Sequence, residues 1–388
     1  MMKRVGFIVL LLVMGGWWAL RWWGWGGETA VSSPPPPFIP LLTDDGDASR
    51  FARVTEPSAV QFPRDLGAHE DYQTEWWYYT GNLVGENGRL FGFQFTIFRR
   101  ALTPEAADTD SDWRTNQVYL AHFTVSDGEN GRFYERERFS RGAAGLAGAQ
   151  AQPYRVWLED WSVRETAAGQ VRLQAKTEEV AVDLLLGQTI PPVLQGDGGL
   201  SQKGPEPGNA SYYYSIVQQQ VRGTVTLPEG TVAVTGIAWK DHEYSTNALP
   251  TDAVGWDWFS LQFDNGAALM LVQIRRQDGS LAFVPDGIFV QPNGTTQLLP
   301  VDSWQLEILD KWTSEASGAT YPMGWRLRVA DLGLEVEGRP LMTNQELTGT
   351  TIYWEGAVQF SGTLDGRPIT AQGYIEMTGY AGSLIGRI

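Results

Sequence analysis

The sequence of 388 residues contains no cysteine, which excludes a disulfide-stapled scaffold and a lipoprotein acylated on cysteine. Lys and Arg number 29 against 45 Asp and Glu, and no basic stripe is available to neutralise phosphates. We therefore expect no nucleic-acid partner. From Val54 onward the sequence also lacks a long helical pattern, a Gly-rich phosphate loop and a G-x-S-x-G nucleophile elbow.

Aromatic residues and glycine are abundant, with 17 Trp, 14 Tyr, 16 Phe and 44 Gly. Short Val-, Thr- and Tyr-rich runs end at Gly, Asn-Gly or Asp-Gly turns about every 8–15 residues, a pattern typical of a barrel or sandwich. EWWYYTGNL with FGFQFTIFRR, and later GWDWFSLQF with ALMLVQIRR, form a loose internal repeat. An all-β chain with two similar domains in tandem is therefore predicted.

The N-terminus predicts export. Lys3 and Arg4 precede an apolar run over 5–20 and a Trp-rich segment, as in a signal peptide or an N-terminal membrane anchor over 1–27. Whether this segment is cleaved stays open. A Pro-rich linker is expected over 28–53, and the remaining chain is expected in the periplasm or another extracytoplasmic space, anchored at the inner membrane if the segment is retained.

The rest of the chain is divided at position 235. A first β-barrel is expected over 54–235 and a second over 236–388. The Gly- and Pro-rich stretch 187–210 reads as a long loop, and loops of that length are usually functional or disordered.

The stretch EWWYY places large rings at consecutive positions of one expected strand, behind Glu75. Successive side chains of a strand point to opposite faces. Both faces of this strand are therefore expected to contact apolar groups, which predicts a barrel strand at a domain interface or at a ligand cavity.

The three histidines are His69, His122 and His242, and each lies in a separate motif more than about fifty residues from the next. That spacing does not resemble a metal-ligand pattern, so we expect no metal and no other cofactor. The third histidine lies in Asp241-His242-Glu243, and Asp257 follows between Trp256 and Trp258.

These motifs resemble the carotenoid 1,2-hydratase and AttH-like family of lipocalin-like proteins. The resemblance spans about 60 to 380 and is carried by FPRDLGAH, EWWYYTGNL, FGFQFTIFR, YLAHF, GIAWKDHEY, GWDWFSLQF, YWEGAVQF and GYIEMTGY. It implies two consecutive lipocalin-like β-barrels and, for the hydratase members, acid-catalysed addition of water to an isoprenoid double bond. One position departs, because the family usually has Trp after DHE and this chain has Tyr244.

Hydration of an unactivated alkene needs a strong proton donor, and a carboxyl group buried among apolar rings suits that role. Asp257 is the expected donor, while Asp241 and His242 are expected to orient or deprotonate water. The expected ligand-binding residues, several of which supply rings that stabilise a cation, are Glu75, Trp76, Trp77, His69, Trp239, Tyr244, Trp256 and Trp258.

Structural alternatives stand beside these roles. Strand alternation would turn Asp257 towards solvent while its two Trp neighbours face the core. The DHE triplet could form a turn, and His122 could be a satisfied core histidine. His69 could bond to Asp65 or Glu75, and Glu75 could pair with an Arg such as Arg99 inside a barrel.

Three function classes remain open. The first is a hydro-lyase acting on a large apolar molecule, an isoprenoid or another lipid. The second is a non-catalytic lipid carrier or an accessory protein of a membrane transporter. The third is an envelope protein that uses its barrels for protein contacts. A buried neutral carboxyl inside a cavity would favour the first, a cavity without one the second, and filled barrels the third.

Overall fold

The computed structural model of the protein describes residues 48–57, 60–105, 111–246 and 248–383. The predicted all-β class is confirmed, because the described chain forms two antiparallel barrel-like sheets and four short 3-10 helices. The predicted membrane segment 1–27 and most of the linker lie outside the described residues. Within the described residues no helix is both long and apolar enough to cross a membrane.

The first sheet has thirteen strands in the order β4-β3-β2-β1-β13-β12-β9-β8-β7-β6-β5, and β10 and β11 pair with β12. Its strands are β1 Thr74–Gly85, β2 Leu90–Ala101, β3 Gln117–Asp127, β4 Arg132–Arg141, β5 Ala147–Ala151, β6 Tyr154–Leu158, β7 Trp161–Ala167, β8 Gln170–Lys176, β9 Ala181–Gln188, β10 Val193–Leu194, β11 Leu200–Gln202, β12 Ala210–Leu227 and β13 Gly230–Ser245.

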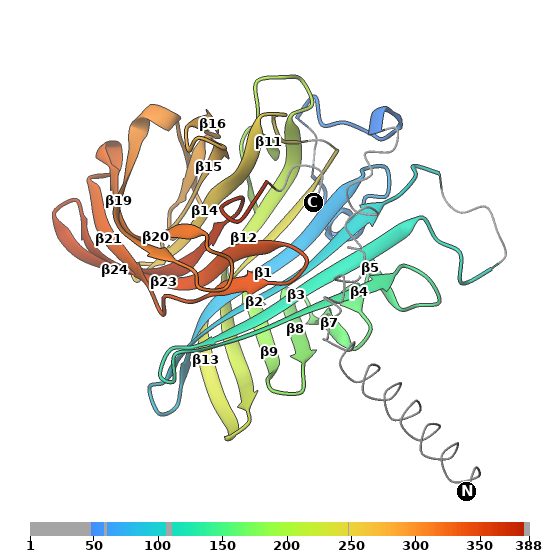
Figure 1. The fold of residues 1–388 in the computed structure, drawn as a ribbon, viewed down its shortest axis with the longest axis horizontal. Coiled ribbons are helices and arrows are strands. Elements are labelled where there is room, and N and C mark those ends of the chain that lie inside the picture. The colour runs from blue at the N-terminus through green and yellow to red at the C-terminus, as the bar shows by residue number, and fades with distance from the viewer. Residues whose placement is uncertain (1–47, 58–59, 106–110, 247, 384–388) are drawn as a thin grey trace, which may run out of the picture. The chain divides into compact units, whose positions relative to one another are not determined.

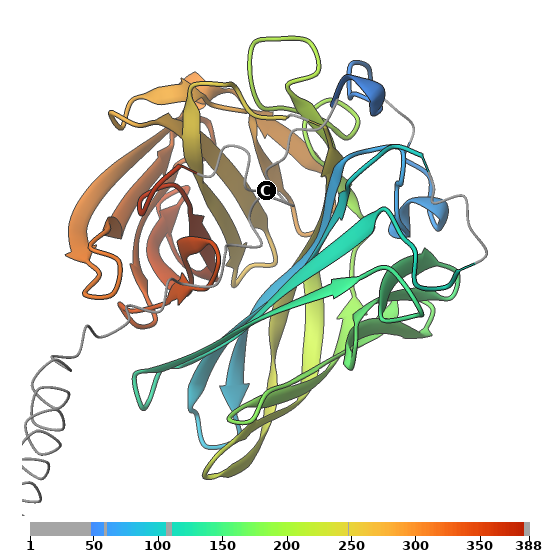
Figure 2. The same cartoon turned by 45° about the vertical axis from the view of Figure 1, so that its right-hand side comes forward.

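The second sheet has eleven strands in the order β18-β17-β15-β14-β24-β23-β21-β20-β19, with β16 on β15 and β22 on β23. Its strands are β14 Ala253–Phe263, β15 Ala268–Arg276, β16 Leu281–Phe283, β17 Gly287–Val290, β18 Thr296–Leu299, β19 Trp304–Thr313, β20 Thr320–Val329, β21 Leu334–Pro340, β22 Glu346–Thr348, β23 Ile352–Leu364 and β24 Arg367–Met377. The 3-10 helices are η1 Ala48–Arg50, η2 Arg64–Leu66, η3 Val301–Ser303 and η4 Ala330–Leu332. Figures 1 and 2 show this sheet, gold to red, curled beside the longer strands of the first.

The loose sequence repeat corresponds to a repeated arrangement of strands. EWWYYTGNL lies in β1 and FGFQFTIFRR in β2, whereas GWDWFSLQF lies in β14 and ALMLVQIRR is β15. In each sheet the first of these strands also pairs with the last long strand, β13 or β24. The expected boundary at 235 falls inside β13, which belongs wholly to the first sheet, so the division into domains stays a prediction.

Strand β1 has apolar groups on both faces because the two sheets pack against each other there. Trp77 and Tyr79 belong to the core of the first barrel, whereas Tyr78, with Trp76 packed against it, belongs to a separate cluster between the barrels. Strand β9 is different, because its buried and partly exposed residues alternate and its outer face meets solvent. The rings of EWWYY thus alternate between the first barrel's interior and the contact with the second.

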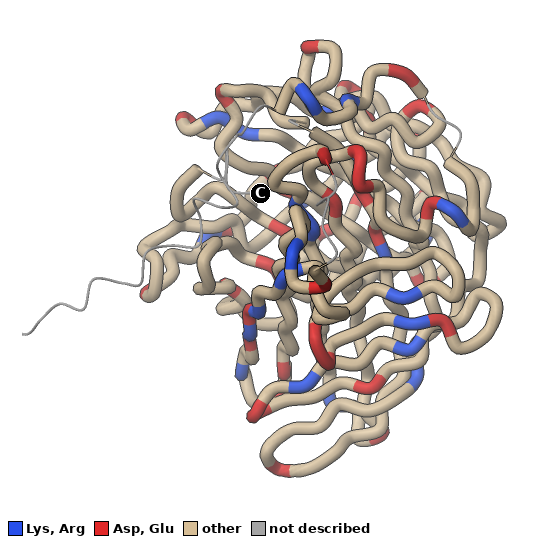
Figure 3. The backbone as a smooth tube through the Cα atoms, turned by 90° about the vertical axis from the view of Figure 1, so that its right-hand side faces the viewer, with Lys and Arg blue, Asp and Glu red and all other residues tan. Residues whose placement is uncertain are grey.

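The two barrels approach closely where β2 crosses β23 and β24. A Cβ on Gly92 would lie 2.6 Å from the Ala357 Cβ and 2.7 Å from the Tyr374 hydroxyl, so a larger residue would separate the sheets. Asn82 Nδ2 donates to the Gly373 carbonyl at 3.0 Å across the same contact. On the face shown in Figure 3, basic and acidic residues are interspersed along the described strands.

Candidate functional site

A cavity of about 510 Å3 lies between the two barrels. Strands β1, β2, β3, β12 and β13 form one wall, and β14, β15, β23 and β24 form the other. Its aromatic lining comprises Trp76, Tyr78, Phe98, Tyr213, Trp256, Trp258 and Tyr353. A volume of this size and a mostly apolar lining are typical of a site for a small organic ligand. The aromatic strand β1 therefore borders both a domain interface and a cavity, as its sequence predicts.

The aromatic walls are held rigid by contacts between rings. Trp258 packs edge-on against Tyr78 at 5.3 Å and against Trp239 at 6.1 Å between ring centroids. Its indole N–H also donates to the Tyr213 hydroxyl at 3.2 Å. Ring faces fixed in this way can stabilise a positive charge that develops in a ligand beside them.

Asp241 is a buried carboxyl group on the cavity wall, with 3% of its surface exposed. Trp239 Nε1 donates to its Oδ1 at 2.7 Å, the Tyr213 hydroxyl donates to its Oδ2 at 2.8 Å, and the Ser215 hydroxyl donates to Oδ1. Burial raises the pKa of Asp241 to about 7, although these three donors act in the opposite direction. At neutral pH the group is therefore divided between its acid and its carboxylate.

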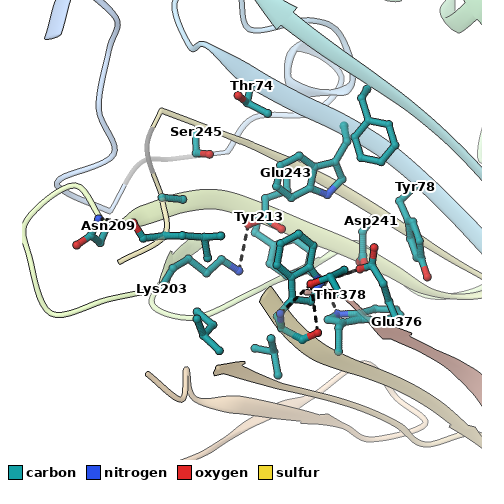
Figure 4. A pocket seen from close by; sticks show the side chains of 18 of the residues that line it. Thr74, Tyr78, Lys203, Asn209, Tyr213, Asp241, Glu243, Ser245, Glu376 and Thr378 are labelled. Carbon is teal, nitrogen blue, oxygen red and sulfur yellow. Dashed lines mark hydrogen bonds and ion pairs between the residues drawn. The ribbon is translucent and has the colours of Figure 1, made fainter. Parts of the chain in front are cut away.

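Glu376 on β24 brings a second such carboxyl from the other barrel (Figure 4). Its pKa is raised to about 7, mainly by burial and also by the charges of Glu243 and Asp241. The 2.8 Å hydrogen bond from Trp256 Nε1 acts in the opposite direction. The side chain is only half-buried, so it is open to the cavity that it lines. A carboxyl that keeps its proton near neutral pH and faces an aromatic cavity can act as a general acid.

Glu355 lies beside Glu376, because the two are directly opposed on β23 and β24. Burial and the neighbouring Glu376 charge hold the pKa of Glu355 well above its ordinary value. Its Oε1 accepts the Tyr78 hydroxyl, while its buried Oε2 has no hydrogen-bond partner. The second barrel thus adds two adjacent carboxyls with raised pKa values next to the aromatic wall.

Part of the Gly- and Pro-rich stretch 187–210 lines the cavity. Lys203, Glu206 and Asn209 come from this segment, and Lys203 Nζ lies 3.0 Å from Glu243 Oε1. Figure 4 shows Lys203 and Asn209 on the loop side of the cavity, away from Tyr78. The segment therefore contributes polar groups to one side of the cavity.

The triplet Asp241-His242-Glu243 is a piece of strand β13 rather than a turn, so its side chains alternate between two faces. Asp241 and Glu243 face the cavity, whereas His242 and Tyr244 face the interior of the first barrel with Glu75 and Trp77. The structure consequently separates His242 from Asp241, although the sequence places them side by side.

Inside the first barrel, Glu75 is the centre of a polar cluster. Arg99 Nε donates to its Oε2 at 2.8 Å, and His69 Nδ1 and His242 Nε2 lie 2.8 and 2.7 Å from its Oε1. Burial alone would raise the pKa of Glu75, but the Arg99 charge and both histidines hold it well below its ordinary value. The structural alternatives for Glu75 and His69, pairing with Arg99 and bonding to Asp65 and Glu75, are thus both observed.

Asp257 lies on β14 between two cavity residues but does not line the cavity. Its carboxylate lies 3.0 Å from Arg275 Nε and accepts the Tyr380 hydroxyl at 3.3 Å. Burial raises its pKa, with Arg275 acting in the opposite direction. Strand alternation accounts for its position on the face opposite its Trp neighbours, but the expected exposure to solvent is wrong, because Asp257 is buried.

Of the residues expected at the site, Trp76, Asp241, Trp256 and Trp258 line the cavity, and Trp239 supports Asp241 from behind. The others, Glu75, Trp77, His69, His242, Tyr244 and Asp257, lie elsewhere. Sequence reasoning missed Glu376, Glu355 and Tyr213. Glu376 lies in GYIEMTGY and Glu355 in YWEGAVQF, two motifs on which the resemblance rests. Nothing in those motifs distinguishes a cavity carboxyl from a structural one.

His122 lies between the cavity and a second pocket of about 240 Å3, because it lines both. Its Nδ1 lies 2.7 Å from the Tyr353 hydroxyl and its Nε2 lies 3.0 Å from Glu137 Oε2. Both ring nitrogens therefore have partners, as expected for a satisfied core histidine.

The family model described as AttH-like matches residues 53–380 of this chain. A putative AttH protein from Nitrosomonas europaea, known from its crystal structure, is 35% identical over 85% of this chain and 100% of its own, with a TM-score of 0.75. No match was found among curated proteins.

Two more distant structures share the fold. Kievitone hydratase from Nectria haematococca is 15% identical, with 86% of this chain and 97% of its own covered and a TM-score of 0.63. CghA, solved with Sch210972, is 11% identical at the same coverage, with a TM-score of 0.51. At these identities the likeness concerns the fold alone.

Proposed function

The chain belongs to the AttH-like family, and we propose that it binds a large apolar molecule, an isoprenoid or a related lipid, between its barrels and adds water to a double bond by acid catalysis. The observation that carries this proposal is the pair Asp241 and Glu376, two carboxyls with a pKa of about 7 in an aromatic cavity. A carrier needs the rings but has no need of neutral acids, which are costly to bury.

The proposed reaction uses Glu376 as the proton donor. Its carboxyl transfers a proton to one alkene carbon, leaving a carbocation on the other carbon and a carboxylate on Glu376. The rings of Trp256, Trp258 and Tyr78 face this charge and stabilise it. A water molecule then forms the carbon–oxygen bond and loses a proton to Asp241. Return of that proton to Glu376 regenerates the site, so the net reaction is alkene plus water giving an alcohol.

Asp241 suits the role of base because its orientation is fixed. Three donors, Trp239, Tyr213 and Ser215, hold the carboxylate, so its position needs no rearrangement during the reaction. This assignment replaces Asp257 as the donor and His242 as the base, because neither lines the cavity. The role expected for Asp257 from the sequence stays a prediction that the variant described below tests.

We also propose that the reaction takes place outside the cytoplasm, at the membrane surface. The basic and apolar segment 1–27 supports export, and a membrane-proximal protein would meet ligands that are poorly soluble in water. A membrane transporter as partner belongs to the carrier alternative.

The test is incubation of the purified protein with lycopene or squalene, two acyclic isoprenoid alkenes, in 18O-labelled water, followed by mass spectrometry. The proposal predicts a product that has gained one labelled water, lost in Glu376→Gln and kept in the exposed control Glu335→Gln. A probe that co-purifies unchanged with the wild-type protein would support the carrier function instead. If neither probe binds, and the membrane fraction of the native host yields no bound lipid, the apolar-ligand proposal fails.

A further inference from the structure

Two of the three histidines meet at Glu75 in the first barrel, on the face of β1 and β13 opposite the cavity. The atoms His69 Nδ1, Glu75 Oε1 and His242 Nε2 all lie within 4.8 Å of one another. Glu75 and His242 side chains are fully buried, and the His69 side chain is 16% exposed. The three residues come from a loop and two neighbouring strands, which explains why their spacing in the sequence does not resemble a metal site.

The outer nitrogen of each imidazole has an orienting partner. His69 Nε2 lies 3.2 Å from Asp65 Oδ1, and His242 Nδ1 lies 2.9 Å from the Tyr214 hydroxyl. Asp65 is itself held by Arg64 and by the backbone N–H of Gln61. Histidines that bind metals usually show this arrangement, in which the second nitrogen donates to a carboxylate or another oxygen and the first faces the ion.

We propose that His69, Glu75 and His242 bind one divalent transition-metal ion, for which their donor set favours Zn2+. Two imidazole nitrogens and one carboxylate oxygen are a ligand set that zinc uses when a fourth position is left to water. Arg99 occupies the other oxygen of Glu75 and fixes the carboxylate with Oε1 toward both rings. None of the three ligands lines the cavity, although Arg99, which holds Glu75, does, so the proposed hydration needs no ion.

The ion would tie the segment before β1 to the barrel. His69 lies in the loop between η2 and β1, whereas Glu75 and His242 lie on adjacent strands that are paired along the whole of β1. The partly exposed His69 offers the route by which an ion enters from solvent. The metal would thus stabilise the folded protein, because it binds the folded chain and not the unfolded one.

The test is a titration of full-length protein, stripped with a chelator, with Co2+ followed by its visible absorption and with Zn2+ followed by calorimetry. The inference predicts one ion per chain, a tetrahedral Co2+ spectrum and a raised melting temperature with Zn2+. His69→Gln, at the accessible ligand, should weaken binding by more than about a hundredfold, and Asp65→Asn by about ten- to a hundredfold. His122→Gln is the matched control, since it removes the histidine outside the cluster and should bind as the wild type does.

Two results would overturn the inference. One is the absence of stoichiometric binding by the stripped wild-type protein. The other is binding that His69→Gln leaves unchanged, which would assign the ion to surface carboxylates. Circular dichroism checks that each variant is folded. If His69→Gln does not fold, Glu75→Gln serves as the second ligand variant, because Gln has the same shape as the Glu that it replaces.

Discussion

Replacement of Asp241 by Asn should change how the stability of the protein depends on pH. Asp241 has a pKa of about 7 in the folded chain and an ordinary value of 3.8. As pH rises above 3.8, the unfolded chain releases this proton while the folded chain keeps it. The free energy of unfolding therefore falls by about 1.4 kcal/mol per pH unit until the folded group also ionises, near pH 7.

Over this window the buried acid costs the wild-type protein about 4 kcal/mol, because a shift from 3.8 to about 7 spans roughly three pH units. Asn carries no such dependence. It inverts one hydrogen bond, at the Tyr213 hydroxyl, which costs about 1 kcal/mol at every pH. Asp241→Asn should therefore be more stable than wild type by about 3 kcal/mol at about pH 8, and slightly less stable at about pH 4.

The assay is urea unfolding followed by tryptophan fluorescence at both pH values, with the exposed Asp331→Asn as control. Contributions from other groups, such as His242, appear in both proteins and cancel to first order in the difference. A stability difference that stays constant across the pH range would refute the reasoning, because it would mean that Asp241 titrates alike in the folded and unfolded chain.

Three further predictions follow from the placement of side chains. Val272→Trp fills the cavity and should abolish fluorescence energy transfer from the cavity tryptophans to the polyene probe cis-parinaric acid. The control Ile308→Trp, on the outer surface, should leave this transfer intact. Equal transfer in both variants would place the ligand elsewhere. Arg99→Leu leaves Glu75 without its counter-charge inside the barrel and should lower the free energy of unfolding by about 3–5 kcal/mol, measured by urea unfolding; a loss under about 1 kcal/mol would contradict a buried pair. Asp257→Asn should lower the melting temperature while the probe still binds, and loss of alkene hydration in a folded variant would restore this residue as the donor.

Much of the fold could be predicted from local sequence patterns. A strand with rings on both faces must be buried on both faces, and the strand that contains EWWYY is buried in this way. These patterns also predicted how a carboxylate among apolar groups is satisfied, because Glu75 pairs with Arg99 and His69 bonds to Glu75. Both contacts connect residues that are close in sequence or lie on neighbouring strands. Alternation alone separates Asp257 from its Trp neighbours.

The site could not be predicted in the same way, because it depends on register and on which face of each barrel meets the other. Tyr213 reaches Asp241 through the pairing of β12 with β13, whose register shifts between Ile216 and Gln219. Glu376 enters the cavity from the other barrel, more than about a hundred residues away in the chain. Residues adjacent in the sequence, such as Asp241 and His242, suggest a single site. In a strand, however, their side chains point to opposite faces and therefore belong to two different sites.

The most direct test of the central claim is carbon NMR of protein labelled with 13C at the glutamate side-chain carboxyls, titrated across pH in wild type and in Glu376→Gln. The account predicts one carboxyl resonance that titrates near pH 7 and disappears in the variant. If the resonance that disappears instead titrates near its ordinary value of 4.5, the cavity holds an ordinary carboxylate and the proposed proton donor is wrong.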